Sequence, residues 1–196
     1  MTKYIEPLLQ AIPEFTWTLD RYHEAIRKGV FTTADKIELL YGKIVDKTPS
    51  GGTHAECVQM VGDFFRERFL GKFTIREEKP VTISNFESEP EPDVVVVTKK
   101  KYAPNHPTEV DIQFIAEIAQ DSIRKDQTIK VVLYAEANIQ EYWIINLIKR
   151  RIEVHLEPLP DEGIYGSVNN YGETSTFTSP FAGEVVVAEL LPLVEE

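Results

Sequence analysis

The chain has 196 residues, and its 42% hydrophobic and 27% charged content is ordinary for a globular protein with one substantial core. Its formal net charge of −11 argues against a simple nucleic-acid coat protein, because such proteins neutralise phosphates with basic side chains. The charge does not exclude a nuclease, since metal ions and local lysines can offset the repulsion near its site.

The number of cysteines and the length of the apolar runs limit the cellular compartments that the protein can occupy. The single cysteine, Cys57, excludes an internal disulfide framework and cysteine-based zinc sites, and it fits a reducing compartment. The N-terminus carries no signal-peptide pattern, and no apolar run is long enough to span a bilayer. We therefore expect a cytoplasmic protein with no membrane partner. Without repeats or low-complexity linkers, the sequence predicts one domain over 1–196, with a core at about 15–155 and a strand-rich extension at 156–196.

The first predicted element is a short amphipathic helix. Residues 1–15 predict an extended lead-in, because two prolines block a long helix there. Thr18 can cap a helix that runs to about Lys28, where Gly29 ends it. His23 lies on this helix, and its position favours a surface or packing role.

A hairpin follows the helix. Tyr41-Gly42 is a turn signal between two short strands within 36–46. Glu38 lies on the first of these strands, and two interpretations stay open for it. The alternating pattern favours a solvent-facing side chain, whereas a functional role would make it a third acid near a metal.

A loop at 49–53 then leads into a helix from about His54 to Leu70, with Gly71 as its end. Its apolar residues recur at helical spacing. His54 lies in the first turn, where its ring and the exposed amides could meet an anion. The alternative is a partly exposed residue of the capping region.

Three strands are predicted in the middle of the chain. Residues 73–76 and 80–83 predict two of them, on either side of a polar stretch. Val94 to Val97 form a β-branched apolar run that is typical of a buried strand. Asp93 stands at the mouth of this strand. The lysines at 99–101, at its far end, predict a solvated turn.

The next strand carries a carboxylate in a buried context. Residues 114–119 are almost continuously apolar, which suits a strand buried on both faces, and Glu117 interrupts them. Burying an ionised carboxylate costs several kcal/mol unless a partner compensates. Glu117 must therefore be paired, be protonated or bind a metal.

A helix at about 123–137 follows, with Asp121 or Ser122 as its cap. Asp126, Lys130 and Tyr134 step by four residues and form one ridge on it. Lys130 could be a surface partner of Asp126, or the ridge could point at the carboxylates of the preceding strand.

Strands close the predicted domain. Residues 141–147 predict a strand that the preceding helix connects to the Glu117 strand as a parallel βαβ unit. Residues 151–155 predict its antiparallel neighbour. After Pro158 the chain is rich in turn residues, with weak strands near 174–178 and 184–187.

The two strand-borne acids, Asp93 and Glu117, can converge on one point if their strands are neighbours. Magnesium is held in this way, by one or two carboxylates together with water and substrate oxygens. The residues alone leave the metal site as one possibility among several.

In its order of motifs, the sequence resembles a family of restriction-endonuclease-like proteins of unknown function within the PD-(D/E)XK nuclease superfamily. The likeness covers about residues 15–155. Its early segments are Ile37-Glu38-Leu39-Leu40-Tyr41-Gly42-Lys43-Ile44-Val45 and the helix start Gly52-Thr53-His54. The later segments are Glu91-Pro92-Asp93-Val94-Val95-Val96-Val97, Glu117-Ile118-Ala119 with Asp126 and Lys130, Leu133-Tyr134-Ala135, and Glu141-Tyr142-Trp143-Ile144-Ile145.

The resemblance implies an α/β fold, a restriction-endonuclease-like mixed central β-sheet flanked by helices. Asp93 matches the family's aspartate and Glu117 its glutamate, and both would bind the metal. The superfamily's lysine usually lies two residues after the glutamate, where this chain has Ala119. Lys130, on the following helix, matches the alternative placement of that lysine. Glu38 and His54 match recurrent polar positions.

The activity that the resemblance implies is hydrolysis of a phosphodiester bond in DNA. Asp93 and Glu117 would hold Mg²⁺ or Mn²⁺, which polarises the phosphate and lowers the pKa of a bound water. Lys130 would orient that water or stabilise the added negative charge. Glu38 could complete the metal shell, and His54 could contact a phosphate. A homodimer is an expected partner arrangement for cutting both strands.

Two other hypotheses compete with the nuclease. The first is a catalytically silent binding or regulatory module on the same scaffold, which the acidic charge and the displaced lysine favour. The second is purely structural, with Glu117 and Lys130 forming a buried ion pair and Asp93 distant from both.

Overall fold

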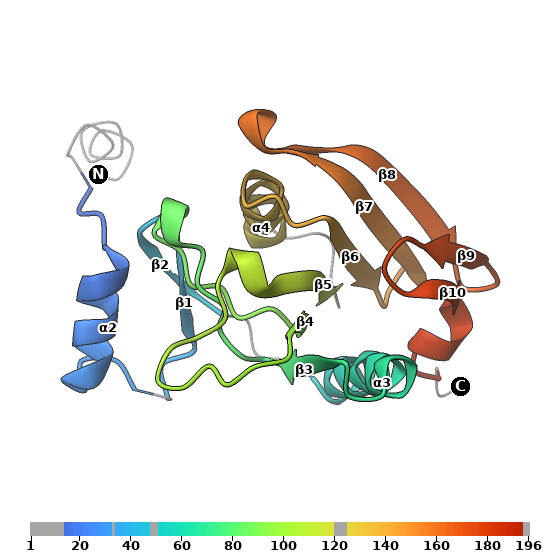
Figure 1. The fold of residues 1–196 in the computed structure, drawn as a ribbon, viewed down its shortest axis with the longest axis horizontal. Coiled ribbons are helices and arrows are strands. Elements are labelled where there is room, and N and C mark those ends of the chain that lie inside the picture. The colour runs from blue at the N-terminus through green and yellow to red at the C-terminus, as the bar shows by residue number, and fades with distance from the viewer. Residues whose placement is uncertain (1–13, 33, 48–50, 120–124, 194–196) are drawn as a thin grey trace, which may run out of the picture.

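The computed structural model describes residues 14–32, 34–47, 51–119 and 125–193 (Figure 1). Most of the predicted lead-in and the predicted helix caps Asp121 and Ser122 lie outside this part of the chain, as does the side chain of Asp126.

A six-stranded mixed sheet forms the centre of the protein, with strand order β3-β4-β5-β6-β7-β8. Strands β5 and β6 pair in parallel, and the other neighbours pair antiparallel. The predicted mixed sheet and its parallel βαβ unit are therefore confirmed. The strands are β3 (Phe73–Glu77), β4 (Val94–Thr98), β5 (Ile112–Ala119), β6 (Glu141–Asn146), β7 (Arg151–Leu159) and β8 (Ile164–Gly172).

The described residues include three α-helices, and the two longer ones lie on opposite faces of the sheet (Figure 1). They are α2 (Leu19–Arg27), α3 (Gly52–Phe69) and α4 (Lys125–Glu136). Thr18 caps α2 as predicted, because its Oγ1 accepts a hydrogen bond from the Arg21 N–H over 3.3 Å. Helix α3 begins two residues earlier than predicted and has Gly51 as its N-cap, without a side-chain hydrogen bond.

The predicted hairpin is present as β1 (Ile37–Leu40) and β2 (Lys43–Asp46), paired antiparallel. Tyr41 and Gly42 form its turn with φ values of 49° and 71°. A two-residue turn with both φ values positive matches the twist of the strands that it joins. At Gly42 a Cβ would lie 2.7 Å from the backbone oxygen of Trp17, so the position also needs glycine for space.

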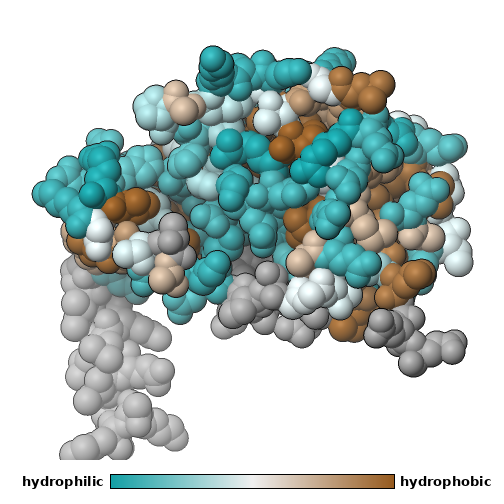
Figure 2. Space-filling view, turned by 90° about the horizontal axis from the view of Figure 1, so that it is seen from below, coloured by the Kyte–Doolittle hydropathy of each residue, from teal (hydrophilic) through white to brown (hydrophobic). Residues whose placement is uncertain are grey.

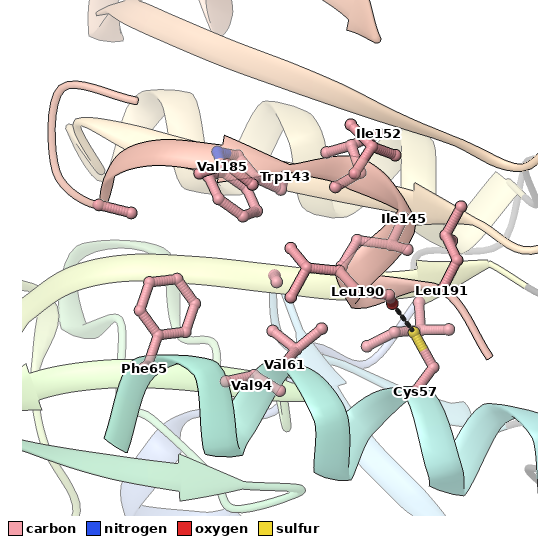
Figure 3. Packing of buried hydrophobic residues seen from close by; sticks show 14 of the residues in the cluster. Cys57, Val61, Phe65, Val94, Trp143, Ile145, Ile152, Val185, Leu190 and Leu191 are labelled. Atoms are coloured by element: carbon pink, nitrogen blue, oxygen red, sulfur yellow. Dashed lines mark hydrogen bonds between the residues drawn. The ribbon is translucent and has the colours of Figure 1, made fainter. Parts of the chain in front are cut away.

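Apolar side chains fill both faces of the sheet. On one face, α3 packs against the sheet and the C-terminal segment, and Val61 and Phe65 point toward Trp143 and Ile145 (Figure 3). The Cys57 thiol, also on α3, donates a hydrogen bond to the carbonyl of Leu190 over 3.3 Å. On the other face, α4 and the β1–β2 hairpin cover a second cluster. Strands β4, β5 and β6 are thus buried on both faces, as their apolar runs predict.

The predicted strand at 80–83 is wrong. Only isolated bridges occur there, from Thr82 to Thr108 and from Ile83 to Ser88. Proline at position 80 has no N–H to donate, and Val81 donates instead to the carbonyl of Pro90 in a loop. The segment still buries Val81 and Ile83, which explains its strand-like apolar pattern.

Strand β8 is missing from the sequence-based prediction, which treated this segment as turn-rich. It contains two glycines and two asparagines, which are typical of turns, but it pairs with β7 over nearly its whole length. The weak strands predicted after it exist with slightly shifted ends. They are β9 (Thr176–Ser179) and β10 (Gly183–Val186).

Short 3₁₀ turns complete the fold. They are η1 (Ser84–Phe86), η2 (Glu109–Asp111), η3 (Pro160–Glu162) and η4 (Val187–Leu190). Hydrophilic residues predominate on the face shown in Figure 2, where apolar residues lie in separate groups. Among the described residues, none of the helices combines the length and hydropathy that a bilayer crossing requires.

Candidate active site

Three carboxylates form a row at one end of the central strands. Strand β3 pairs with β4 up to Glu77 opposite Val94, and β4 pairs with β5 from Val94 opposite Ala116. Extending both registers by one residue places Asp93 between Glu78 and Glu117. Residues opposite each other on neighbouring strands have Cβ atoms about 5 Å apart. Strand pairing therefore brings together acids that are distant in the sequence.

Two hydrogen bonds fix Asp93 in this row. Its carbonyl accepts the Glu78 N–H over 3.0 Å, and its carboxylate Oδ2 accepts the Ile118 N–H over 2.6 Å. The second bond holds the Asp93 carboxylate against β5, next to Glu117. Asp93 and Glu117 are thus neighbours, as the sequence predicts.

His54 lies over the same carboxylate. Its Nε2 is 3.2 Å from Asp93 Oδ2, and the residue is buried, so the interpretation as a partly exposed capping residue is wrong. Burial by itself would lower the pKa of His54, but the hydrogen bond and charge of Asp93 outweigh burial and raise it, with Glu78 and Glu117 adding to the effect. The predicted contact between His54 and a phosphate stays a prediction.

Glu117 is almost completely buried, and two donors from α4 reach it. Lys130 Nζ lies 3.1 Å from its Oε1, and the Tyr134 hydroxyl donates to the same oxygen over 3.0 Å. Burial raises the pKa of Glu117 to about 7, although Lys130 opposes this shift. Burial also raises the pKa of Tyr134, which therefore remains a protonated donor.

Lys130 lies between two buried acids. Besides Glu117, it contacts Glu38 Oε2 at 3.1 Å, and Glu38 also accepts the Glu91 N–H over 3.1 Å. Burial lowers the pKa of Lys130, but Glu117, Glu38 and Asp93 together hold it above its ordinary value. With exposures of 3% for Glu38 and 6% for Lys130, the solvent-facing interpretation of Glu38 and the surface-pair interpretation of Lys130 are both wrong.

The ridge formed by Lys130 and Tyr134 points at a carboxylate of the preceding strand, which was one of its two predicted orientations. Both side chains come from one side of α4 and meet at Glu117. Sequence analysis missed Glu78, which follows β3 with a left-handed φ of 47°. The signal for it was the acidic pair Glu77-Glu78 at the end of β3, which becomes informative only once the β3–β4 register is known.

The predicted metal ligands are Asp93 and Glu117. The side chains that lie close enough to share a cation are partly different. Among the described residues they are His54, Glu78 and Asp93, whose ligand atoms lie within 4.8 Å of one another. Glu117 borders this group but is held by Lys130 and Tyr134. Two carboxylates and an imidazole suit a divalent cation such as Mn²⁺. His54 Nδ1 is buried without a hydrogen-bond partner among the described residues, so protein contacts alone do not saturate the ring.

The purely structural hypothesis has two requirements, and the structure meets one of them. The buried Lys130–Glu117 pair that it requires is present, but Asp93 is adjacent to that pair rather than distant from it.

Comparison with known proteins agrees with this architecture. The family model Uma2, described as "Putative restriction endonuclease", matches residues 19–188. The fold is similar to the crystal structure of a "putative nuclease" from Anabaena variabilis, with a TM-score of 0.67 and 16% sequence identity over 88% of this chain and 96% of that one. No curated protein sequence matches the chain.

Proposed function

Because the chain belongs to the Uma2 family, we propose that it is a metal-dependent endonuclease that hydrolyses phosphodiester bonds in DNA. One observation carries this proposal. Asp93, Glu117 and Lys130 come from separate parts of the chain and lie together where β4 begins and β5 ends, with Glu117 and Lys130 buried. A protein surface with a net charge of −11 repels DNA, so a cation at this acidic position also offsets the repulsion locally.

The acidic row offers ligands for a cation. Asp93, with His54 and Glu78 beside it and Glu117 on the next strand, would hold Mg²⁺ or Mn²⁺. When bound, such an ion polarises the phosphate and lowers the pKa of a water molecule.

The remaining residues supply charge and proton transfer. The Lys130 ammonium stabilises the negative charge that develops on the phosphate. Glu117, whose pKa burial raises to about 7 in the metal-free protein, would accept a proton from the attacking water. Tyr134 and Lys130 keep its Oε1 in place, and Glu38 keeps Lys130 in place. Glu38 and Tyr134 are thus positioning residues.

Cleavage of supercoiled plasmid DNA tests the proposal. The wild type should nick the plasmid with Mg²⁺ or Mn²⁺ and not with EDTA, and Asp93→Asn should lower the rate at least a hundredfold. Asp63→Asn is the matched control, because Asp63 is an exposed acid of α3 that pairs with Arg66. Failure of the wild type to cleave any nucleic acid with either metal would contradict the proposal.

A homodimer remains a prediction that belongs to this proposal. One site per chain cuts one strand, so a double-strand break by a single assembly requires two copies. Light scattering during gel filtration would test this, and a monomer at the concentrations that give double-strand breaks would count against it.

A specific observation also favours the second candidate, a catalytically silent binding module. Lys130 is already neutralised by two buried acids, Glu117 and Glu38, which is the arrangement of a self-contained ion cluster. Calorimetry with Mg²⁺ and Mn²⁺ separates the two candidates. The nuclease predicts measurable binding that Asp93→Asn abolishes, whereas the silent module predicts no heat of binding for either metal.

A further inference from the structure

We infer that the cation site contains a nitrogen ligand and is formed by His54, Glu78 and Asp93, and that it binds Mn²⁺ more tightly than Mg²⁺. The inference rests on the proposed function, since it concerns the same cation. It restricts the ligands to these three residues and adds a preference between two ions. It also gives Glu117 a role beside the site rather than in its first coordination sphere.

Strand pairing and a helix start make the three ligands converge. His54 is in the first turn of α3, Glu78 follows β3, and Asp93 precedes β4. The hydrogen bond from the Glu78 N–H to the Asp93 carbonyl locks two of these positions together. Donor atoms around one ion with bonds of about 2.1 Å lie roughly 3 to 4 Å apart. Small side-chain rotations therefore suffice to bring donors that lie within 4.8 Å onto one ion.

The side chains of Glu78 and His54 differ from that of Glu117 in their hydrogen bonds. Glu117 Oε1 is already bonded to both Lys130 and Tyr134 inside the protein. The Glu78 carboxylate is exposed and makes no hydrogen bond with another described residue. His54 Nδ1 is buried and has no hydrogen-bond partner among the described residues either. Among the described residues, the Glu78 carboxylate and His54 Nδ1 thus have ligand capacity left for a cation, whereas Asp93 Oδ2 already accepts the Ile118 N–H and faces His54 Nε2.

The chemical types of the three ligands are the reason for the expected preference for Mn²⁺ over Mg²⁺. Mg²⁺ strongly favours oxygen ligands and keeps several of its waters. Imidazole suits transition-metal ions, and carboxylates suit hard divalent ions, so this combination suits Mn²⁺ better than Mg²⁺. The nitrogen of His54 is therefore the discriminating ligand. The Glu78 carboxylate strengthens the binding of either ion.

Manganese binding to the full chain tests this directly. Free Mn²⁺ is measured by electron paramagnetic resonance during titration, and Mg²⁺ affinity by competition. We expect Mn²⁺ to bind at least tenfold more tightly than Mg²⁺. His54→Gln should lower the Mn²⁺ affinity at least tenfold and reduce the Mn²⁺/Mg²⁺ ratio toward one. Glu78→Gln should weaken both ions by a similar factor and leave the ratio unchanged.

Glu56→Gln is the matched control. It makes the same charge change as Glu78→Gln, at an exposed acid of α3 that lies two residues from His54 in the sequence. It should change both affinities less than twofold. Spin-echo modulation from a directly bound ¹⁴N nucleus gives a second measurement on the wild type that needs no variant to fold. The inference predicts this modulation in the Mn²⁺ complex.

Equal affinities for the two ions, absence of the ¹⁴N modulation, or a His54→Gln variant that behaves like Glu56→Gln would each overturn the inference. These failures are distinguishable from failure of the proposed function. DNA cleavage without selective Mn²⁺ binding would overturn the inference alone. Selective Mn²⁺ binding with ¹⁴N modulation but no cleavage would support it and contradict the nuclease.

Discussion

The carboxylate of Asp93 accepts the backbone N–H of Ile118 over 2.6 Å, which ties the residue before β4 to β5 immediately beside Glu117. This bond places an acid at the end of one strand next to an acid inside another. The parallel connection from β5 through α4 to β6 then returns Lys130 to the same end of the sheet. The fold thus creates a compact group of opposite charges from three distant parts of the chain.

Removal of the Lys130 charge should strongly destabilise the protein. Lys130→Met leaves Glu117 and Glu38 buried with no cation between them, and breaking a buried pair in this way costs roughly 3 to 5 kcal/mol. Urea unfolding measures the loss. Lys28→Met is the control, because Lys28 forms an exposed pair with Glu24 and its loss should cost under about 1 kcal/mol. Equal losses for the two variants would contradict the buried cluster.

The raised pKa of Glu117 makes stability depend on pH. The pKa rises from 4.5 in the unfolded chain to about 7 in the folded protein, so between these values the folded state holds a proton that the unfolded state has released. The contribution of Glu117 is therefore fully present below pH 4.5 and is lost as the pH rises through about 7. The shift corresponds to roughly 3 kcal/mol.

Comparison of the wild type with Glu117→Gln isolates this contribution, because the other titrating groups are shared. We expect the stability of the variant relative to the wild type to increase by roughly 3 kcal/mol between pH 4.5 and pH 8. Urea unfolding at several pH values in EDTA measures it. A stability difference that stays constant over this range would show that the pKa of Glu117 is not raised.

Tyr134 should affect the titration of Glu117 as well as stability. Tyr134→Phe removes a buried hydrogen bond to Glu117, which costs about 1 kcal/mol and disfavours the ionised carboxylate. Tyr165→Phe is the control, because its hydroxyl donates to the carbonyl of Ile139 and loses a comparable bond. Only Tyr134→Phe should shift the pH dependence of stability to higher pH. Identical pH profiles for the two variants would contradict the assigned role.

The thiol of Cys57 should be unreactive while the protein is folded. Burial raises its pKa to about 12, and its Sγ points into the core toward Leu190 (Figure 3). Labelling with a thiol reagent at pH 8 should be at least a hundredfold slower in buffer than in concentrated urea. Rapid labelling without denaturant would mean that the packing between α3 and the C-terminal segment opens readily.

Local patterns were sufficient to predict the elements whose sequence signals agree with their tertiary contacts. The helix capped by Thr18, the Tyr41-Gly42 hairpin and the buried runs of β4 and β5 are all present. The ridge of Lys130 and Tyr134 was also visible from their spacing, and the buried position of Glu117 indicated that it must be paired, be protonated or bind a metal.

Features that depend on pairing partners escaped prediction. Strand β8 has the composition of a turn, and its pairing with β7 overrides that local preference. Val81 and Ile83 have a strand-like pattern, but loops rather than strands accept their hydrogen bonds. Glu78 joins the site only because β3 and β4 pair in one particular register. Periodicity along a single segment contains no information about that register.

The central claim is that a divalent cation binds at Asp93. Its most direct test is a crystal structure of the protein with Mn²⁺, with the ion located by anomalous scattering. We predict one strong peak within bonding distance of the Asp93 carboxylate, with His54 and Glu78 as further ligands and Lys130 still held between Glu117 and Glu38. A well-ordered crystal at saturating Mn²⁺ with no peak beside Asp93 would contradict it.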